Sequence, residues 1–552
     1  MKPIYTLDIE TDPFKHGRRP VAFAIGFYDG EKYVHFWGKK CIQEMFEYLQ
    51  TREEGIIYAH NGGRFDVLGY LMKWIINRSM RIINSRIILA EMECGHELRD
   101  SYAIMPFPLG AYKGKTQKKE IEIKKLEKKV REKNKAEIVE YLGYDCKSLW
   151  ELCSEFVDRY GPALTIGTTS MRELKKIHTF ELLSPDEDMD LRSQYFYGGR
   201  TEYFEKGILW GDFKVYDVNS MYPHVMRSMM HPIGKPSMEG TRIGKNTCFI
   251  TALGINKGAF PQRMKDGGIS FLETEGEFSV TRHEWDMALK YNLFQPTKVL
   301  RTVDFDEQGT FAEFVDKFYN ERLEARAAGD EITALFLKFI LNSAYGKFAQ
   351  SRENYREYII TDQTMNPGNG WIPDTLMNFE VLPEDNYIVW SKPSKDVSCF
   401  NVATGASITG GARSVLMEAL AVCERPIYCD TDSVVCESLP LQLDENSLGA
   451  WKLETSFDLA AVGRKKLYAF FLTDKDKVKE FLAKNPKKKK EKDGSVCVKQ
   501  ANKGVSITPA EIMRVCKGEI VNTKRDAPSF KLDGRHEFIQ RRVRMAGMEM
   551  PK

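Results

Sequence analysis

Short apolar runs separated by polar turns open the chain. Ile4–Thr11 alternates apolar and polar side chains and contains β-branched residues, which predicts a strand. A second apolar run, Ile56–Ile57, leads into a loop that contains Gly62–Gly63. Apolar residues then recur at helical spacing from Ile138 to Leu149. The pattern therefore predicts two strands and a helix in this part of the chain.

A second set of elements is predicted further along. An apolar run ends at Asp217, and residues 425–435 read as a strand, a tight turn and another strand. Between them, residues 336–347 have helical spacing, and Lys338, Asn342 and Tyr345 fall on the face opposite the apolar side chains. We expect this helix to present polar groups to a site.

The connections suggest how the chain is divided. Ser184–Asp188 looks like a linker and marks a domain boundary after residue 185. Residues 232–310 contain hairpin-like strands and are too long for a plain connection. Residues 352–398 are rich in Asn, Gly and Pro and read as a hairpin or loop insertion. A helix is predicted from Thr409 to Leu420, and Thr508–Glu511 has the form of a capping box that starts another helix.

The bulk composition is that of an ordinary globular protein of several domains. The net charge of +3 does not by itself indicate a nucleic-acid partner, so DNA binding would need local basic grooves. The eleven cysteines form no CxxC pair, which is typical of reduced thiols in the cytosol. We find no signal peptide and no apolar run long enough to cross a membrane, and we expect a cytoplasmic protein.

Three acidic residues from two distant segments are the first candidate site. Asp430 and Asp432 are two residues apart, and such residues point to the same side of an extended chain. Their concentrated negative charge suits hard divalent ions such as Mg²⁺. If Asp217 meets them across a sheet, the three carboxylates make a site for two metal ions of the kind used in phosphoryl transfer. The alternative is a polar hairpin turn, because Asp and Thr are common in turns.

Four further carboxylates form a second candidate set. Asp8 and Glu10 share one face of the first predicted strand, and Asp66 follows the glycine loop. Asp145 lies one helical turn after Tyr141 and therefore on the same helix face. These groups are the complement of a second two-metal site, whereas the alternative is a set of surface acids.

The segments that contain these residues resemble the motifs of family B DNA polymerases. Asp217–Pro223 is similar to motif A, Lys338–Lys347 to motif B and Tyr428–Ser433 to motif C. The motif sequences resemble most those of the protein-primed branch found in phages with small linear genomes, and of the tectivirus-type enzymes within it. The segments around Asp8, Asp66 and Asp145 resemble the three motifs of proofreading 3′→5′ exonucleases.

The resemblance implies an RNase H-like 3′→5′ exonuclease domain, at 1–185, followed by a right-hand polymerase domain, at 186–552, in an α/β and α+β multidomain fold. Within the polymerase domain it implies a palm (about 190–231 and 399–468), a first insertion that docks the terminal protein (about 232–310), fingers (about 311–351), a second insertion (about 352–398) and a thumb (about 469–552).

The resemblance also implies roles for the acidic residues and their neighbours. Asp217 and Asp432 would bind two Mg²⁺ directly, with Asp430 in support, and Mn²⁺ is an alternative ion. Asp8, Glu10, Asp66 and Asp145 would bind a second pair, with Tyr141 orienting the attacking water. The implied nucleotide-binding residues are Tyr222, which excludes a 2′-hydroxyl or is simply a core tyrosine, Lys338, Asn342 and Tyr345.

The implied DNA contacts come from five further segments. His60, Asn61, Phe65 and Ser101 would hold a frayed primer end, with Tyr102 as an additional stacking residue. The others are Tyr197, Gly198 and Gly199 of a Tyr-Gly-Gly motif, Thr409 and Arg413 of a Thr-x-Gly-x-Ala-Arg-like motif, and Lys466 and Tyr468 of a Lys-x-Tyr motif.

The resemblance implies a DNA-directed DNA polymerase with proofreading, which replicates a linear viral genome from a terminal-protein primer in the host cytoplasm. Its partners would be template–primer DNA, single-stranded DNA, dNTPs and the terminal protein, and it would be a monomer or a heterodimer with that protein. Strand displacement is expected. The alternatives are a conventionally primed family B polymerase and a non-catalytic DNA-binding replication factor.

Overall fold

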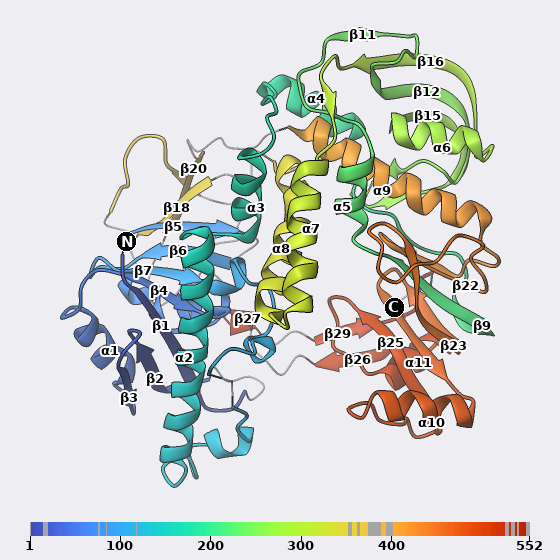
Figure 1. Ribbon diagram of the computed structural model, residues 1–552. Coiled ribbons are helices and arrows are strands. Elements are labelled where there is room, and N and C mark those ends of the chain that lie inside the picture. The colour runs from blue at the N-terminus through green and yellow to red at the C-terminus, as the bar shows by residue number, and fades with distance from the viewer. Residues whose placement is uncertain are drawn as a thin grey trace.

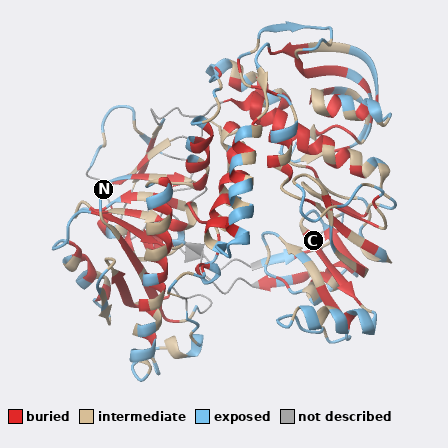
Figure 2. Cartoon of the chain, in the orientation of Figure 1, coloured by how far each residue is buried: buried red, intermediate tan, exposed pale blue. Residues whose placement is uncertain are grey.

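The computed structural model divides into an N-terminal lobe, a central group of helices and a C-terminal lobe (Figure 1). Buried residues are concentrated in the sheets of both lobes and in the helices between them (Figure 2). The structure describes residues 2–14, 20–75, 78–83, 86–116, 119–265, 267–351, 356–361, 365–373, 388–393, 401–524, 529–530, 536–537 and 540–547.

The N-terminal lobe is built on a ten-stranded sheet in the order β19-β20-β18-β5-β6-β7-β4-β1-β2-β3. Its strands are β1 (Ile4–Thr11), β2 (Ala22–Tyr28), β3 (Tyr33–Trp37), β4 (Ile56–Ala59), β5 (Ser79–Ile83), β6 (Arg86–Glu91), β7 (Glu97–Asp100), β18 (Arg356–Thr361), β19 (Ile372–Pro373) and β20 (Ile388–Pro393). β4 pairs in parallel with β1 and β7, and the other pairs are antiparallel. The predicted helix is confirmed as part of α2 (Lys135–Tyr160), which packs on β1 and β2.

Part of this sheet comes from the predicted second insertion. Tyr358 of β18 lies opposite Met80 of β5, and β20 pairs with the other edge of β18. Tyr358, Ile360 and Val389 are buried in the same apolar core as β1 and β4. The described strands of the insertion therefore extend the N-terminal sheet, whereas its residues 352–355, 362–364, 374–387 and 394–398 lie outside the described part.

The C-terminal lobe is built on a seven-stranded antiparallel sheet in the order β25-β24-β23-β9-β22-β21-β8. Its strands are β8 (Thr201–Tyr203), β9 (Gly207–Val218), β21 (Tyr428–Asp430), β22 (Ser433–Cys436), β23 (Trp451–Arg464), β24 (Leu467–Leu472) and β25 (Val496–Asn502). The predicted palm–thumb boundary at 469 falls inside β24, and β25 continues the same sheet. The strands on either side of the predicted boundary therefore belong to one sheet.

Residues 232–310, called the 232–310 region below, carry a sheet of their own. Four antiparallel strands follow the order β11-β16-β12-β15, and helix α6 (Arg282–Lys290) packs against them. The strands are β11 (Met238–Gly240), β12 (Thr247–Lys257), β15 (Glu273–Thr281) and β16 (Phe294–Asp304). Two-stranded pairs are formed by β10 (His231–Pro232) with β17 (Gln308–Gly309), β13 (Gln262–Arg263) with β14 (Ile269–Ser270), β26 (Val521–Lys524) with β29 (Gln540–Val543), and β27 (Ser529–Phe530) with β28 (His536–Glu537).

Helices join the two lobes and cover their cores (Figure 1). The remaining helices are α1 (Cys41–Leu49), α3 (Ile166–Lys175), α4 (Pro185–Tyr195), α5 (Met221–Ser228), α7 (Ala312–Ala327), α8 (Glu331–Phe348), α9 (Val402–Val422), α10 (Lys475–Lys484) and α11 (Pro509–Cys516). Short 3₁₀ or π turns lie at Gly62–Arg64, Val67–Leu71, Met72–Trp74, Ser101–Ala103, Leu109–Ala111 and Ile123–Leu126. The helix predicted from Thr409 starts earlier, at Val402. None of the helices within the described residues combines the length and apolar character needed to span a bilayer.

Two helix starts test the predicted signals. The capping box at Thr508 and Glu511 is confirmed at the start of α11. The prediction that Ser184–Asp188 is a linker is wrong, because Ser184 caps α4 and Glu187 closes a second capping box around Pro185. The segment has a Ser-Pro start and an acidic first turn, which are helix-starting features rather than linker features.

Candidate active sites

The predicted strand, tight turn and strand are confirmed, and Asp430–Asp432 forms the turn itself rather than a stretch of extended chain. β21 ends at Asp430, β22 begins at Ser433, and Thr431 adopts the left-handed conformation (φ 62°). The amide of Asp432 donates to the carbonyl oxygen of Asp430 (2.7 Å). Ser433 lies opposite Asp430 on one side and Asp217 on the other. The turn and the strand register together bring the three aspartates to one place.

One open cavity of about 380 Å³ collects these carboxylates. The residues that line it are Asp217, Asp430, Thr431, Asp432, Ser433, Glu454, Lys466, Tyr468 and Lys499. Of the predicted residues, the structure thus brings together the three aspartates with Lys466 and Tyr468.

The electrostatics of this cavity show how closely the acids interact. Burial and then the negative charges of Asp217 and Asp430 raise the pKa of Asp432 to about 6. Burial also raises the pKa of Asp217, although Lys452 lies 3.6 Å from its carboxylate and opposes the shift. Oxygen donors that repel one another in this way fit hard divalent cations.

Lysines occupy part of the same space. Lys466 Nζ donates to both carboxylate oxygens of Asp430, at 2.6 and 2.7 Å. Among the described residues, no three His, Cys, Asp or Glu side chains are already grouped closely enough to hold a metal ion. Asp217 and Asp432 are the better placed donors, because Asp430 is neutralised by Lys466.

Sequence reasoning missed two residues that line this cavity, Glu454 and Lys499, and a third, Lys452, that lies beside Asp217. Lys452 and Glu454 come from β23, where Lys452 pairs with Asp217, and Lys499 comes from β25 and forms an ion pair with Glu454. None of the three lies in a recognisable motif. Only the register of β23 against β9 could have identified Lys452.

Helices α5 and α8 supply the predicted nucleotide-binding residues. The rings of Tyr222 and Tyr345 stack on each other, with 3.7 Å between centroids and 14° between planes. Lys338 lies on α8, and its side chain is exposed overall although its ammonium group is partly buried. This partial burial lowers the pKa of Lys338, and the positive charges of Arg322, Lys452 and Arg326 lower it further. Asn342 donates its side-chain N–H to the carbonyl oxygen of Lys338 (2.9 Å). The cations repel one another and so favour an anion between them.

The second carboxylate set is gathered at one end of β1. The backbone turns sharply after β4, where Asn61 is left-handed (φ 62°) and a Cβ at Gly63 would lie 1.9 Å from the carbonyl oxygen of Ile87. This turn delivers Asp66, which is buried, and burial followed by the charge of Asp8 raises its pKa well above the usual range. Asp66 Oδ1 has no hydrogen-bond partner among the described residues, an orphaned oxygen that fits a cation ligand.

Helix α2 brings the other members of this set. Burial raises the pKa of the Tyr141 hydroxyl, and the charges of Asp145, Glu10 and Asp8 raise it further. A side-chain hydrogen bond also joins Tyr141 to Asp145. The predicted tyrosine and its carboxylates therefore form one cluster.

The predicted single-strand contacts separate into two groups. His60 Nε2 lies 2.9 Å from the carbonyl oxygen of Phe107, and His60 Nδ1 lies 3.0 Å from Ser101 Oγ. Ser101 is 0% exposed and orients His60, and its predicted contact with DNA stays a prediction. Tyr102 is half-buried, and its ring packs against His60 (5.6 Å). Asn61 is exposed and Phe65 is half-buried.

Thr409 and Arg413, which are predicted to contact DNA, are both buried and bonded within the protein in this structure, and their DNA contacts stay predictions. Thr409 is buried, and its hydroxyl donates to the carbonyl oxygen of Ala406. Arg413 is 2% exposed, and its guanidinium forms an ion pair with the buried carboxylate of Glu284, which compensates its charge. In the Tyr-Gly-Gly motif Tyr197 is buried and Gly198 is exposed, so the backbone rather than the tyrosine ring is accessible.

Comparison with known proteins agrees with this geometry. Residues 111–439 match the family model of DNA polymerase type B, organellar and viral. The chain is 42% identical to the DNA-directed DNA polymerase of Enterobacteria phage PRD1, over 98% of each chain. It is 27% identical to the DNA polymerase of Bacillus phage Nf, over 55% of each chain. The protein therefore belongs to the type B DNA polymerases of organelles and viruses.

Solved structures share the fold. Phi29 DNA polymerase complexed with primer–template DNA aligns with a TM-score of 0.74 at 17% identity, covering 99% of this chain and 100% of that one. The same polymerase with primer–template DNA and incoming nucleotides aligns with a TM-score of 0.72 at 19% identity and the same coverage. At this identity the likeness shows a common fold.

Proposed function

We propose that the protein is a replicative DNA-directed DNA polymerase with a 3′→5′ proofreading exonuclease, primed by a terminal protein. The observation that carries the polymerase assignment is the cavity in which Asp217, Asp430 and Asp432 converge from two strands. The chain also belongs to a family of DNA polymerases, which supports the same assignment.

Side chains in and near the polymerase cavity have distinct roles in this proposal. Asp217 and Asp432 would hold two Mg²⁺, which when bound lower the pKa of the attacking hydroxyl and neutralise charge on the leaving pyrophosphate. Lys338 orients the triphosphate together with the neighbouring Arg322 and Arg326. Lys466 neutralises Asp430 and, together with Tyr468, would hold the primer end beside the carboxylates.

The second cluster supports hydrolysis of mispaired ends. Asp8, Glu10, Asp66 and Asp145 would hold the cations of this site, and Tyr141 would orient the attacking water. His60, fixed by Ser101 and Phe107, and the exposed Asn61 would bind the frayed strand. The orphaned oxygen of buried Asp66 supports a cation there, since a buried carboxylate is costly without one.

The two activities can be separated in one experiment. Primer extension and single-strand degradation are measured in Mg²⁺ for the wild type, Asp432→Ala and Asp8→Ala. We expect Asp432→Ala to lose extension and keep degradation, and Asp8→Ala to do the reverse. Unchanged extension by Asp432→Ala would refute the polymerase site, and loss of both activities in each variant would refute two independent sites.

Protein priming is tested with the candidate terminal protein, labelled dNTPs and Mg²⁺. We expect label to become covalently attached to a Ser, Thr or Tyr of that protein, and Asp432→Ala to abolish the attachment. Extension of ordinary DNA primers with no such attachment would favour the conventionally primed alternative. The separate sheet of the 232–310 region supports a docking role, because it is larger than a connection requires.

A further inference from the structure

The backbone of the Tyr-Gly-Gly motif is held by two arginines from other parts of the chain. Arg413 Nη1, on α9, donates to the carbonyl oxygens of Tyr197 (2.7 Å) and Gly198 (2.8 Å). Arg263, on β13, donates to the carbonyl oxygen of Phe196 (2.7 Å), and its guanidinium lies 4.6 Å from the centre of the Tyr197 ring. Three successive carbonyls therefore face arginines of the protein.

The charge of Arg413 is fixed by Glu284 of α6. Glu284 Oε1 and Oε2 accept from Arg413 at 2.7 and 3.0 Å, and both side chains are almost completely buried. Glu284 Oε2 also accepts from the backbone and hydroxyl of Thr281 and completes the capping box of α6. Arg413 cannot turn toward a phosphate without leaving this carboxylate buried and unpaired, which is strongly unfavourable.

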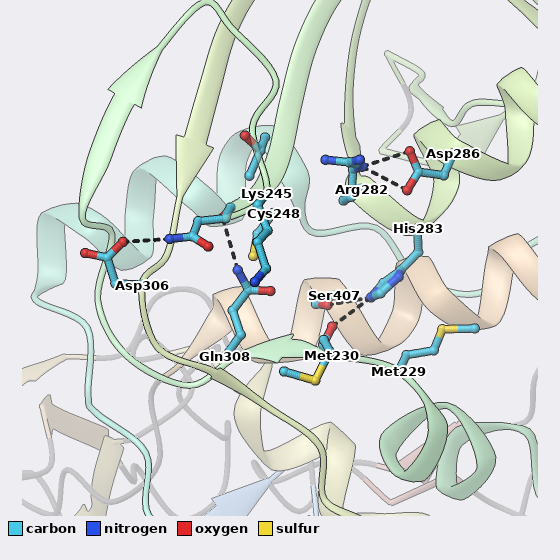
Figure 3. A pocket seen from close by; sticks show the side chains of 12 residues that line it. Met229, Met230, Lys245, Cys248, Arg282, His283, Asp286, Asp306, Gln308 and Ser407 are labelled. Carbon is cyan, nitrogen blue, oxygen red and sulfur yellow. Dashed lines mark hydrogen bonds and ion pairs between the residues drawn. The ribbon is translucent and has the colours of Figure 1, made fainter.

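Helix α6 is itself anchored to the helices around the polymerase site (Figure 3). His283 Nε2 donates to the carbonyl oxygen of Met230 (3.0 Å), just after α5, and lies 3.3 Å from Ser407 Oγ on α9. A Cβ at Gly410 would lie 2.2 Å from Thr281 Oγ1, so α6 and α9 pack at backbone distance. A cavity of about 560 Å³ lies beside this contact. Glu284 is thus held in a fixed position relative to α5 and α9.

The other end of the held segment meets the catalytic turn. A Cβ at Gly199 would lie 2.8 Å from the Thr431 side chain, and the Thr431 amide donates to the carbonyl oxygen of Arg200 (2.7 Å). Thr201 Oγ1 donates to Asp430 Oδ1 (2.9 Å). The backbone from 196 to 201 therefore connects the two arginines with the turn that carries Asp430 and Asp432.

We propose that Arg263 and Glu284 of the 232–310 region are positioning residues that shape the Tyr197–Gly199 backbone for the sugar–phosphate chain of the template. Arg263 holds the carbonyl of Phe196, and Arg413, itself fixed by Glu284, holds those of Tyr197 and Gly198, whereas no protein acceptor within the described residues takes the amide N–H of Gly198 or Gly199. Free amides beside glycine can approach a phosphate oxygen closely. The inference rests on the proposed polymerase function and gives the 232–310 region a task besides docking a priming protein.

The first test uses Arg263, which is exposed, so that its replacement leaves the core intact. Equilibrium binding of primer–template DNA, without nucleotide, is measured for Arg263→Met, Arg263→Lys and a matched control, Arg242→Met, which removes an exposed arginine of the same region. We expect the Kd of Arg263→Met to rise about tenfold, with partial rescue by lysine and no change in the control. The KM for dNTP at saturating DNA and the degradation of unpaired single strands should stay at the wild-type level.

Wild-type affinity in Arg263→Met, or an equal loss of single-strand degradation, would overturn the proposal. Failure of the wild type to extend a primer would overturn the proposed function instead, and the binding measurement does not depend on it.

A second test uses Glu284→Gln, which retains side-chain size and the helix cap. We expect Glu284→Gln alone to weaken primer–template binding as well. In the double variant Glu284→Gln/Arg263→Met, the fold increase in Kd should be smaller than the product of the two single-variant increases, because both residues act on one segment. Thermal unfolding identifies a variant that is simply misfolded, and in that case Arg413→Lys, which keeps the charge beside Glu284, takes its place. Multiplicative effects would refute a shared route through the Tyr197–Gly199 backbone.

Discussion

Tyr222 and Tyr345 stack face to face, with ring centroids 3.7 Å apart. Tyr222 lies on α5, one turn after the strand that carries Asp217, and Tyr345 lies on α8 with Lys338 and Asn342. Burial raises the pKa of both hydroxyls most strongly. For Tyr222 the neighbouring Tyr345 raises the pKa further, and the negative charge of Asp432 adds a smaller increase for both tyrosines. The stack therefore joins the helix that follows Asp217 to the helix that carries Lys338, so it connects the proposed metal-binding and triphosphate-binding residues, and each ring supports the other.

Two substitutions of Tyr222 test whether its ring excludes the 2′-hydroxyl of a ribonucleotide or only supports Tyr345. Tyr222→Phe keeps the stack, so we expect nearly wild-type extension. Tyr222→Val removes the ring, and we expect ribonucleotide incorporation to rise by about 10- to 100-fold relative to dNTP, as a pocket that loses a blocking group discriminates less. Single-nucleotide kcat/KM for matched dNTP and rNTP measures this ratio. An unchanged ratio in Tyr222→Val would show that the ring does not face the sugar.

The raised pKa of Asp432 predicts a conflict between stability and function. The folded pKa of about 6 lies above the unfolded value of about 3.9, so the folded state holds this proton more tightly. The stabilising contribution is complete below about pH 4 and is lost as the pH rises through about 6. At pH 7.5 in EDTA we expect Asp432→Asn to be more stable than the wild type by about 1–3 kcal/mol, and inactive in extension.

Denaturant unfolding at pH 4 and pH 7.5 measures this difference. The matched control is Asp430→Asn, which removes a carboxylate already neutralised by Lys466 and should give no stabilisation. Equal stability of Asp432→Asn and wild type at the higher pH would contradict an uncompensated charge at Asp432.

The same pKa predicts how Mg²⁺ and protons compete. Because a metal ligand must be deprotonated, we expect the Mg²⁺ concentration for half-maximal extension to rise as the pH falls below about 6. Mg²⁺ should also raise the Tm of the wild type by more than it raises the Tm of Asp432→Asn, which keeps only the second carboxylate cluster, since a ligand stabilises the state that binds it. Thermal scans in Mg²⁺ and in EDTA test the second point. A shift of equal size in both proteins would locate the stabilising ion elsewhere.

The parts of the fold that could be predicted from the sequence are those with a local signal. The helical spacing of Lys338, Asn342 and Tyr345 and the capping box at Thr508 are confirmed in α8 and α11, because a helix repeats within a few residues. The candidate carboxylates were found in the same way, since each belongs to a short motif at a strand end or on a helix.

The rest depends on contacts between distant residues, which leave no local pattern. The pairing of Tyr358 with Met80 joins two strands whose sequences contain no sign of each other. The role of Arg413 could not be predicted either, because an arginine serves a phosphate or a carboxylate equally well, and only Glu284, buried on another helix, decides between them.

The contrast between Ser101 and Tyr102 gives a last prediction, for the proposed exonuclease site. Ser101 acts through His60, whereas the half-buried Tyr102 ring packs against His60 and lies 4.8 Å from the Arg86 guanidinium. We expect Tyr102→Ala to raise the KM for a single strand by about tenfold or more with little change in kcat, because one stacking surface for a base is worth about 1–3 kcal/mol. Ser101→Ala should instead change how the rate depends on pH, since it removes the hydrogen bond at His60 Nδ1.

Steady-state degradation of a labelled oligonucleotide between pH 6 and pH 9 distinguishes the two effects. Tyr102→Phe is the matched control, because it keeps the ring and loses only the hydroxyl, and it should behave as the wild type. An equal rise in KM for Tyr102→Phe and Tyr102→Ala would assign the effect to the hydroxyl rather than to stacking. An unaltered KM in Tyr102→Ala would mean that the strand passes on another side of His60.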